Sequence, residues 1–168
     1  MVQDDHASTG IRLHLGCGKK RLDGYVNIDG FEPSADVIAD IRKLPYDDNS
    51  VDEIVAIHVF EHFEVWEAEG IAREWHRVLR PGGVLVMEMP SFDKVVKLLK
   101  ENTPKGLVYG LLGLYGDWKL ERPEMTHKWC WQHMSLAKLL EKIGFASITI
   151  KEPKTHVKAR DFRVEAIK

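Results

Sequence analysis

The sequence is constrained most by a strand-like stretch that runs into a glycine turn and is followed by a second strand-like stretch ending on an acid. Apolar residues alternate through Ile11–Leu15, Gly16-Cys17-Gly18 follows, and residues 25–29 end at Asp29. A glycine turn beside a strand-end carboxylate is typical of doubly wound α/β proteins that hold a nucleoside-containing ligand, because glycine lets the backbone approach and the acid binds ribose hydroxyls. Only residues 19–24 separate the two parts, which is too short for a full crossover helix.

The rest of the chain alternates strand-like and helix-like patterns. The apolar run at 51–58 predicts a strand buried on both faces of a parallel sheet, and the helical spacing of 65–79 ends at Arg80-Pro-Gly-Gly83. Ser135 is expected to cap a helix that ends at Gly144. The order predicts an α/β fold: a Rossmann-like, doubly wound, mostly parallel sheet with an antiparallel C-terminal strand and a reduced first crossover helix. Further strands are predicted at 35–41, 84–89, 145–151 and 162–167, and a further helix at 92–99.

Length and composition indicate one domain. The chain has 168 residues, 44% of them hydrophobic, and a net charge of −2, so its charge gives no reason to expect nucleic acid or an acidic membrane surface as a partner. Neither Cys17 nor Cys130 belongs to a CxxC pair, and no apolar run approaches the ~20 residues that span a bilayer. Residues 1–10 are polar and lack a signal-peptide core, so we expect a flexible N-terminus, a single domain over 11–168 and a cytoplasmic protein.

Two patterns suggest other classes of site. The glycine turn does not fit a dinucleotide site, because Asp29 follows sooner than the expected ~20 residues and no third glycine is present. His58-Val-Phe-Glu-His62 matches the zinc-protease pattern H-x-x-E-H. That chemistry needs both histidines on one helical face, whereas His58 is predicted to end a strand. We therefore predict no metal site, and a metallohydrolase using His58 and His62 is the weaker alternative.

At the level of ordered motifs, the sequence resembles the class I S-adenosylmethionine-dependent methyltransferases, in the branch of small enzymes that act on small molecules. Several segments match in the order that the family shows, and together they extend over most of the chain from residue 11 to residue 145, with a closing strand beyond. They are Leu13–Gly18, Asn27–Asp29, Ala39–Asp52, Glu61-His62 with Arg77–Gly83, Leu139–Phe145, and Phe162–Lys168.

The resemblance implies S-adenosylmethionine as the cofactor and assigns residues to it by position. The glycine turn would pass under the methionine part, and Asp29 would accept hydrogen bonds from both ribose hydroxyls. Asp40 would lie beside the adenine amino group, with Ile41 and Leu44 on the ring, although Asp40 has an alternative interpretation as a turn cap. His58 would face the cofactor from the substrate side. The residues assigned to the cofactor are Gly16, Cys17, Gly18, Asp29, Asp40, Ile41 and His58.

The acceptor side is less defined by the sequence. Residues 102–134 show weak periodicity and many aromatic residues, which is typical of a substrate lid or insertion, and equally of a satellite core or partner interface. A general base suits an oxygen acceptor, and His127, His58 and His133 are the candidates, His127 being the first choice.

The acceptor expected from these features is a small molecule. The chain lacks the (Asp/Asn)-Pro-Pro-aromatic tetrapeptide that nucleic-acid amino-methylating enzymes of this superfamily carry. A non-catalytic cofactor-binding or partner module of the same fold is the alternative function. The shortened first crossover removes a helix from one side of the sheet, and three alternatives follow: that side is open, is covered by residues 1–10, or is buried in a homodimer. Trp66 and Trp75 could serve such an interface or pack in the core.

Overall fold

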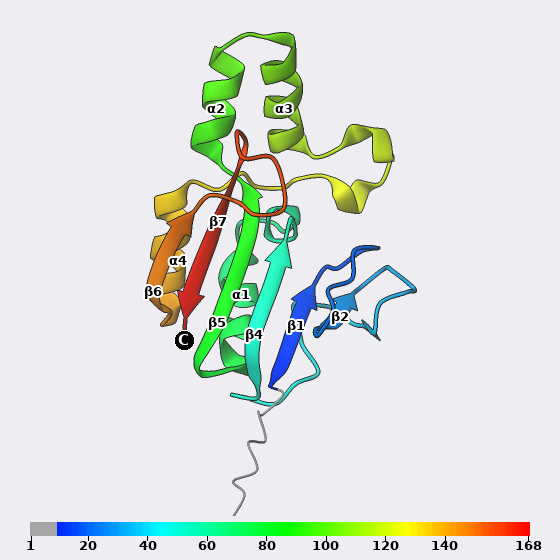
Figure 1. Ribbon diagram of the computed structural model, residues 1–168, viewed down its shortest axis with the longest axis vertical. Helices are drawn as coiled ribbons and strands as arrows, with labels where there is room; N and C mark the ends of the chain where they lie inside the picture. The colour runs from blue at the N-terminus through cyan, green and yellow to red at the C-terminus, as the bar shows by residue number, and fades with distance from the viewer. Residues whose placement is uncertain (1–9) are drawn as a thin grey trace, which may run out of the picture.

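The computed structural model describes residues 10–168, so most of the expected N-terminal extension, residues 1–9, lies outside the described part. One mixed sheet organises the chain (Figure 1). Its strands are β1 (Ile11–Leu15), β2 (Val26–Asp29), β3 (Val37–Ile38), β4 (Val51–Ile57), β5 (Leu79–Pro90), β6 (Ala146–Lys151) and β7 (Asp161–Ile167). Their order is β3-β2-β1-β4-β5-β7-β6, and β7 runs antiparallel to both of its neighbours. The predicted fold class, including the antiparallel closing hairpin, is confirmed.

The helices lie on one face of the sheet and beyond its carboxyl end. They are α1 (Ala68–Val78), α2 (Phe92–Lys100), α3 (Pro104–Tyr115) and α4 (His133–Ile143), with 3₁₀ turns η1 (Phe60–His62), η2 (Trp118–Leu120) and η3 (Pro123–Met125). In Figure 1, α1 and α4 lie behind the sheet, whereas the pair α2 and α3 extends past the ends of β4 and β5. Within residues 10–168, none of these helices has the length and apolar character needed to cross a membrane.

The core lies between the sheet and the helices α1 and α4. Leu13 and Leu15 of β1 and Leu136 and Leu140 of α4 belong to the same buried cluster, all at 0% exposure. Trp75 of α1 is also fully buried, and its Nε1–H donates to the carbonyl oxygen of Ile41 at 2.9 Å. Trp75 therefore belongs to the core and not to a surface interface, while Trp66 is 76% exposed.

No helix joins β1 to β2. A buried asparagine holds the connecting backbone in place through hydrogen bonds. The Asn27 side chain, 2% exposed, accepts from the backbone N–H of Leu22 at 2.7 Å and donates to the carbonyl oxygens of Leu22 and Tyr25. It also contacts the Asp36 carboxylate and the ring of His14. Since these bonds satisfy the turn without a helix, the predicted reduced crossover is confirmed, with Asn27 as its anchor.

Three elements differ from the sequence-based expectation at their ends. The strand predicted at 35–41 is only β3, because Asp36 accepts from the backbone N–H of Asn27 and Asp40 closes a local turn with Arg42. The helix predicted at 65–79 begins later, at α1, and the strand predicted to start at 84 already begins at Leu79. Its first residue pairs with Val51, and a register shift in β4 precedes the regular pairing.

The segment 102–134 was expected to be irregular, but it contains the helix α3. Gly106, Gly110 and Gly113 lie on one face of α3, and a Cβ added to them would contact α2 residues. The added Cβ of Gly110, for example, would lie 2.6 Å from Leu99. These glycines weaken helix propensity by roughly 1 kcal/mol each, yet they let the two helices approach closely.

Helix α4 begins earlier than predicted. Ser135 lies inside its first turn and donates to the carbonyl oxygen of Gln132, so the predicted cap at Ser135 is wrong. The predicted end at Gly144 is correct.

Candidate cofactor and acceptor site

The glycine turn and the acidic end of β2 lie side by side at the carboxyl edge of the sheet. Gly16 and Gly18 both have positive φ, +61° and +48°, a conformation that glycine adopts without steric cost. Cys17 N–H donates to the carbonyl oxygen of Ile28 at 3.2 Å, and Gly18 N–H donates to Asp29 Oδ2 at 2.9 Å. The structure thus brings together four of the residues assigned to the cofactor.

The Asp29 carboxylate also organises the backbone that follows β2. Its Oδ1 accepts from the N–H groups of Phe31 at 2.8 Å and Glu32 at 3.0 Å. A carboxylate offers about four lone-pair sites, so the three backbone bonds leave about one for an outside donor. Asp29 therefore holds the glycine turn in place and keeps limited capacity for a ligand hydroxyl.

The residues assigned to the adenine side, Asp40, Ile41 and Leu44, differ in their surroundings. The Asp40 carboxylate is paired with the guanidinium of Arg42 at 2.8 Å and accepts from the Arg42 backbone N–H at 2.9 Å. This is the geometry of the alternative interpretation of Asp40 as a turn cap, and the pairing lowers the pKa of Asp40. Ile41 and Leu44 are buried, at 7% and 3% exposure, as parts of the hydrophobic core.

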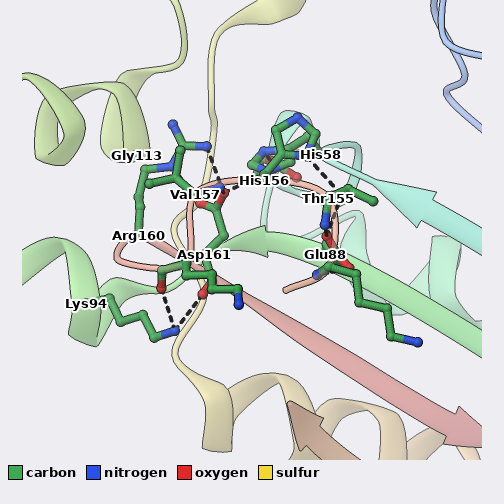
Figure 2. Close-up of polar contacts among 12 residues, drawn as sticks. His58, Glu88, Lys94, Gly113, Thr155, His156, Val157, Arg160 and Asp161 are labelled. Atoms are coloured by element: carbon green, nitrogen blue, oxygen red, sulfur yellow. Dashed lines mark hydrogen bonds and ion pairs between the residues drawn. The ribbon is translucent and has the colours of Figure 1, made fainter. Parts of the chain in front are cut away.

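The end of β4 carries a second cluster of polar residues. His58 follows β4 directly with a positive φ of 54°, which turns the chain into η1. Its Nδ1 lies 2.8 Å from Glu61 Oε1, and its Nε2 lies 3.2 Å from Oδ2 of Asp161, the first residue of β7. Figure 2 shows His58 among Asp161, His156 and Thr155, which approach it from β7 and the preceding loop. Burial alone favours the neutral ring, but Glu61 and Asp161 raise the pKa of His58 to about 9.

His127 joins this cluster from the segment 102–134. Its Nε2 lies 3.9 Å from Glu61 Oε1, and its Nδ1 lies 3.0 Å from the carbonyl oxygen of Gly113. The backbone carbonyl of Glu61 accepts from the N–H groups of Lys128 and Trp129, which fixes this stretch against η1. Burial is the main cause that lowers the pKa of His127, so its ring is neutral near pH 7.

His133 has different surroundings. Its Nε2 lies 2.8 Å from Ser91 Oγ, at the start of α2, and its ring packs against Phe162 at a centroid distance of 4.4 Å. Ser91 is the side-chain cap of α2, accepting from the Lys94 N–H. Of the three predicted histidines, His58 and His127 therefore share Glu61, whereas His133 contacts a helix cap.

The cofactor turn and the histidine cluster are in direct contact through one residue. A Cβ added to Gly16 would lie 2.5 Å from Cγ2 of Val59, which stands between His58 and Glu61 in the chain. Residues 16–18 and the loop after β4 therefore line the same edge of the sheet, where ligands of open α/β sheets bind.

Two buried acids of this region were not singled out from the sequence. Glu88 of β5 is fully buried and bonded to Arg163 Nη1 at 2.9 Å and to the backbone N–H of Thr155 at 3.1 Å. A single charge inside the apolar run 84–89 was the available signal for it. Asp161 had no comparable signal, because its partner His58 lies 103 positions away in the chain.

Comparison with known proteins agrees with this architecture. A family model described as a methyltransferase domain matches residues 19–87. A probable S-adenosylmethionine-dependent methyltransferase of Mycolicibacterium smegmatis is 41% identical over 51 residues, which are 30% of this chain and 19% of the relative. The chain thus aligns with about a fifth of the length of that curated relative.

Solved structures match over nearly the whole chain. A methyltransferase of Thermotoga maritima, described as a possible histamine N-methyltransferase, has a TM-score of 0.64 at 14% identity, covering 95% of this chain and 82% of that one. An S-adenosylmethionine-dependent methyltransferase of Archaeoglobus fulgidus has a TM-score of 0.63 at 15% identity, covering 95% and 86%. At such identities these structures establish the fold.

The strand order with its antiparallel β7 is that of the class I methyltransferase fold. A methyltransferase domain model matches residues 19–87, and the fold is shared with solved structures of S-adenosylmethionine-dependent methyltransferases.

Proposed function

We propose that this chain transfers the methyl group of S-adenosylmethionine to a small-molecule acceptor. The observation that carries the proposal is the hydrogen bond between Gly18 N–H and Asp29 Oδ2, because it holds an open backbone turn next to a carboxylate. The turn is suited to the methionine part of the cofactor, and the remaining acceptor capacity of Asp29 to a ribose hydroxyl.

The chemistry asks mainly for orientation. The sulfonium of the cofactor is already electrophilic, so a lone pair of the acceptor forms the new bond to the methyl carbon. The S–CH₃ bond breaks with its electron pair going to sulfur, which leaves S-adenosylhomocysteine. Alignment of the reacting atoms can lower such a barrier by about 7–11 kcal/mol in ideal intramolecular cases.

The histidine cluster supports an acceptor position above the end of β4. His58 and Glu61 belong to the loop that packs on the glycine turn through Val59, and His127 lies against Glu61, so an acceptor bound there would be next to the methyl group. The helix α3 and residues 116–126 would act as the lid over it. A small acceptor, not a nucleic acid, fits the net charge of −2 and the absence of a (Asp/Asn)-Pro-Pro-aromatic motif.

Calorimetric titration with S-adenosylmethionine tests cofactor binding. Asp29→Asn is expected to weaken binding about 10- to 100-fold, because a hydrogen bond to a charged group contributes roughly 1.5–3 kcal/mol. Asp23→Asn is the matched control, since it makes the same substitution at an exposed position of the connection between β1 and β2. Equal affinities of the two variants would contradict the assignment of Asp29.

Transfer of a labelled methyl group to metabolite pools then tests catalysis and identifies the acceptor. Binding without transfer to any pool would favour the alternative, a cofactor-binding module without enzymatic activity.

A further inference from the structure

The carboxylate of Glu61 is the least satisfied polar group of the described chain near the candidate site. The residue is 1% exposed, and neither of its oxygens accepts a hydrogen bond of acceptable geometry from residues 10–168. His58 Nδ1 approaches Oε1 to 2.8 Å, but this contact is an ion pair by distance alone. Buried charges in proteins are paired and hydrogen-bonded or they coordinate metals, so the position of Glu61 requires an explanation.

Three potential ligand atoms converge at this carboxylate. One potential ligand atom each of His58, Glu61 and His127 lies within 4.8 Å of the other two, and the nitrogens that approach Glu61 are His58 Nδ1 and His127 Nε2. Tetrahedral ligands at the usual zinc bond lengths of about 2.0–2.2 Å lie roughly 3.3 Å apart. The observed separations from Glu61 Oε1, 2.8 Å to His58 and 3.9 Å to His127, bracket that value. Side-chain adjustments of about an ångström would bring the three atoms around one cation.

The far nitrogen of each histidine already has the partner that a metal-binding histidine needs. His58 Nε2 faces Asp161 Oδ2 at 3.2 Å, and Asp161 is itself held by the guanidinium of Arg160. His127 Nδ1 faces the Gly113 carbonyl at 3.0 Å. Such outer partners hold a proton on the far nitrogen, so the near nitrogen is the one that would bind a cation, releasing any proton it carries. Figure 2 shows Asp161 and Arg160 near each other, both to the left of His58.

We propose that His58, Glu61 and His127 form a site for one divalent transition-metal ion, with zinc as its best-suited occupant. Two histidines and one carboxylate are a donor set of zinc and of iron(II) sites, and three protein ligands leave coordination positions open. The site departs from the sequence-based expectation of no metal. The pattern H-x-x-E-H suggested His58 with His62, whereas the structure pairs His58 with His127, 69 positions further along the chain.

The open positions suggest what the ion would do, and this part rests on the proposed function. The ligand loop packs on the glycine turn through Val59, so the cation would lie on the acceptor side of the cofactor. A divalent cation favours oxygen donors that can lose a proton, and it would orient a hydroxyl-bearing acceptor. His127 would then act as a ligand through Nε2 and not as the general base, and the hydroxyl proton would pass to water.

Cobalt(II) and zinc titrations of the chelator-treated, full-length protein test the site directly. We expect one Co²⁺ per chain, with visible absorption bands of a low-symmetry four- or five-coordinate ion, and displacement of Co²⁺ by stoichiometric Zn²⁺. Absence of saturable Co²⁺ and Zn²⁺ binding to the folded wild-type chain would overturn the proposal. In that case the cluster is an ion-pair network in which a protonated His58 bridges two carboxylates.

Variants locate the ligands. Glu61→Gln is expected to lower zinc affinity at least about 100-fold, and Asp161→Asn, which changes only an outer partner, about 10- to 100-fold. His76→Gln is the control, because it removes a histidine of α1 that packs against Phe145, remote from Glu61 in its contacts. Equal zinc affinity of folded Glu61→Gln and His76→Gln would refute the ligand assignment. Should Glu61→Gln not fold, His127→Gln provides the same comparison.

Activity separates this inference from the proposed function. Metal binding without any methyl transfer would leave the site standing and remove the proposed catalysis. Methyl transfer at an undiminished rate in the chelator-treated enzyme would remove the role of the cation toward the acceptor, while the titrations decide independently whether the site exists.

Discussion

The two glycines of the turn offer a matched pair of substitutions. Both have positive φ, so alanine at either position costs about 1 kcal/mol of backbone strain after the gain from a less flexible unfolded chain. At Gly18 the added Cβ meets no atom within 4 Å, whereas at Gly16 it would lie 2.5 Å from Val59 Cγ2. Overpacking of this kind costs about 1–3 kcal/mol more. We therefore expect Gly18→Ala to destabilise the protein by about 1 kcal/mol and Gly16→Ala by about 2–4 kcal/mol.

A double-mutant cycle isolates the contact between Gly16 and Val59. Val59→Ala alone should cost about 1.5 kcal/mol or more, because it removes two buried methyl groups' worth of transfer free energy. In the Gly16→Ala background it also removes the clash, so the double variant should be more stable than additivity predicts, by about 1–3 kcal/mol. Urea unfolding followed by far-UV circular dichroism measures all four proteins.

Titration with S-adenosylmethionine gives a second measurement on the two glycine variants, their affinity for the cofactor. The space in front of Gly18 is where the methionine part is proposed to lie, so Gly18→Ala should weaken S-adenosylmethionine binding despite its small effect on stability. Additive free energies in the cycle, or equal destabilisation by the two alanines, would refute the close approach of the turn to the loop after β4.

Three further outcomes are expected. Trp75→Phe should lower the free energy of unfolding by about 2–4 kcal/mol, because it leaves the buried carbonyl of Ile41 without its donor and removes core volume; chemical denaturation measures this. Lys151 and Arg163 lower the pKa of Glu165 to about 2. The ionised Glu165 therefore stabilises the protein above about pH 4.5, and this stabilisation is lost as the pH falls through about 2. Glu165→Gln should flatten the dependence of stability on pH in that window, which thermal unfolding at a series of pH values measures. His127→Ala should slow methyl transfer and leave S-adenosylmethionine affinity unchanged, whether the ring serves as base or as ligand of a catalytic cation; unchanged turnover would exclude a catalytic role of either kind.

The sequence alone predicted those parts of the fold whose signals are local. The glycine turn and Asp29 lie within fourteen positions of each other, and the periodic runs of the later strands and helices are visible in single windows. Helix α3 was missed because residues 102–134 show weak periodicity, and the reason for its glycines lies in another element, the residues of α2 that they approach. At α3 the packing against α2 outweighs the low helix propensity of glycine.

The candidate site shows the same division. Residues 16–18 and 29 could be assigned to the cofactor because their spacing carries information. The pairing of His58 with Asp161 and of Glu61 with His127 joins segments that only the folded sheet brings together. No spacing rule connects such positions, so the sequence could name His58 and His127 as candidates without placing them around one carboxylate.

The segment that follows η3, residues 126–131, is held by several backbone hydrogen bonds. Lys128 and Trp129 bond to the carbonyl of Glu61, and the carbonyl of Trp131 accepts from the N–H of Phe92 at the start of α2. Under the proposed function, residues 116–126 are the part of the proposed lid that lies ahead of these hydrogen bonds, so we expect an opening for a small molecule to involve this span. Length changes in that span should alter which molecules enter while sparing the sheet, so it is the natural place to graft a new acceptor preference.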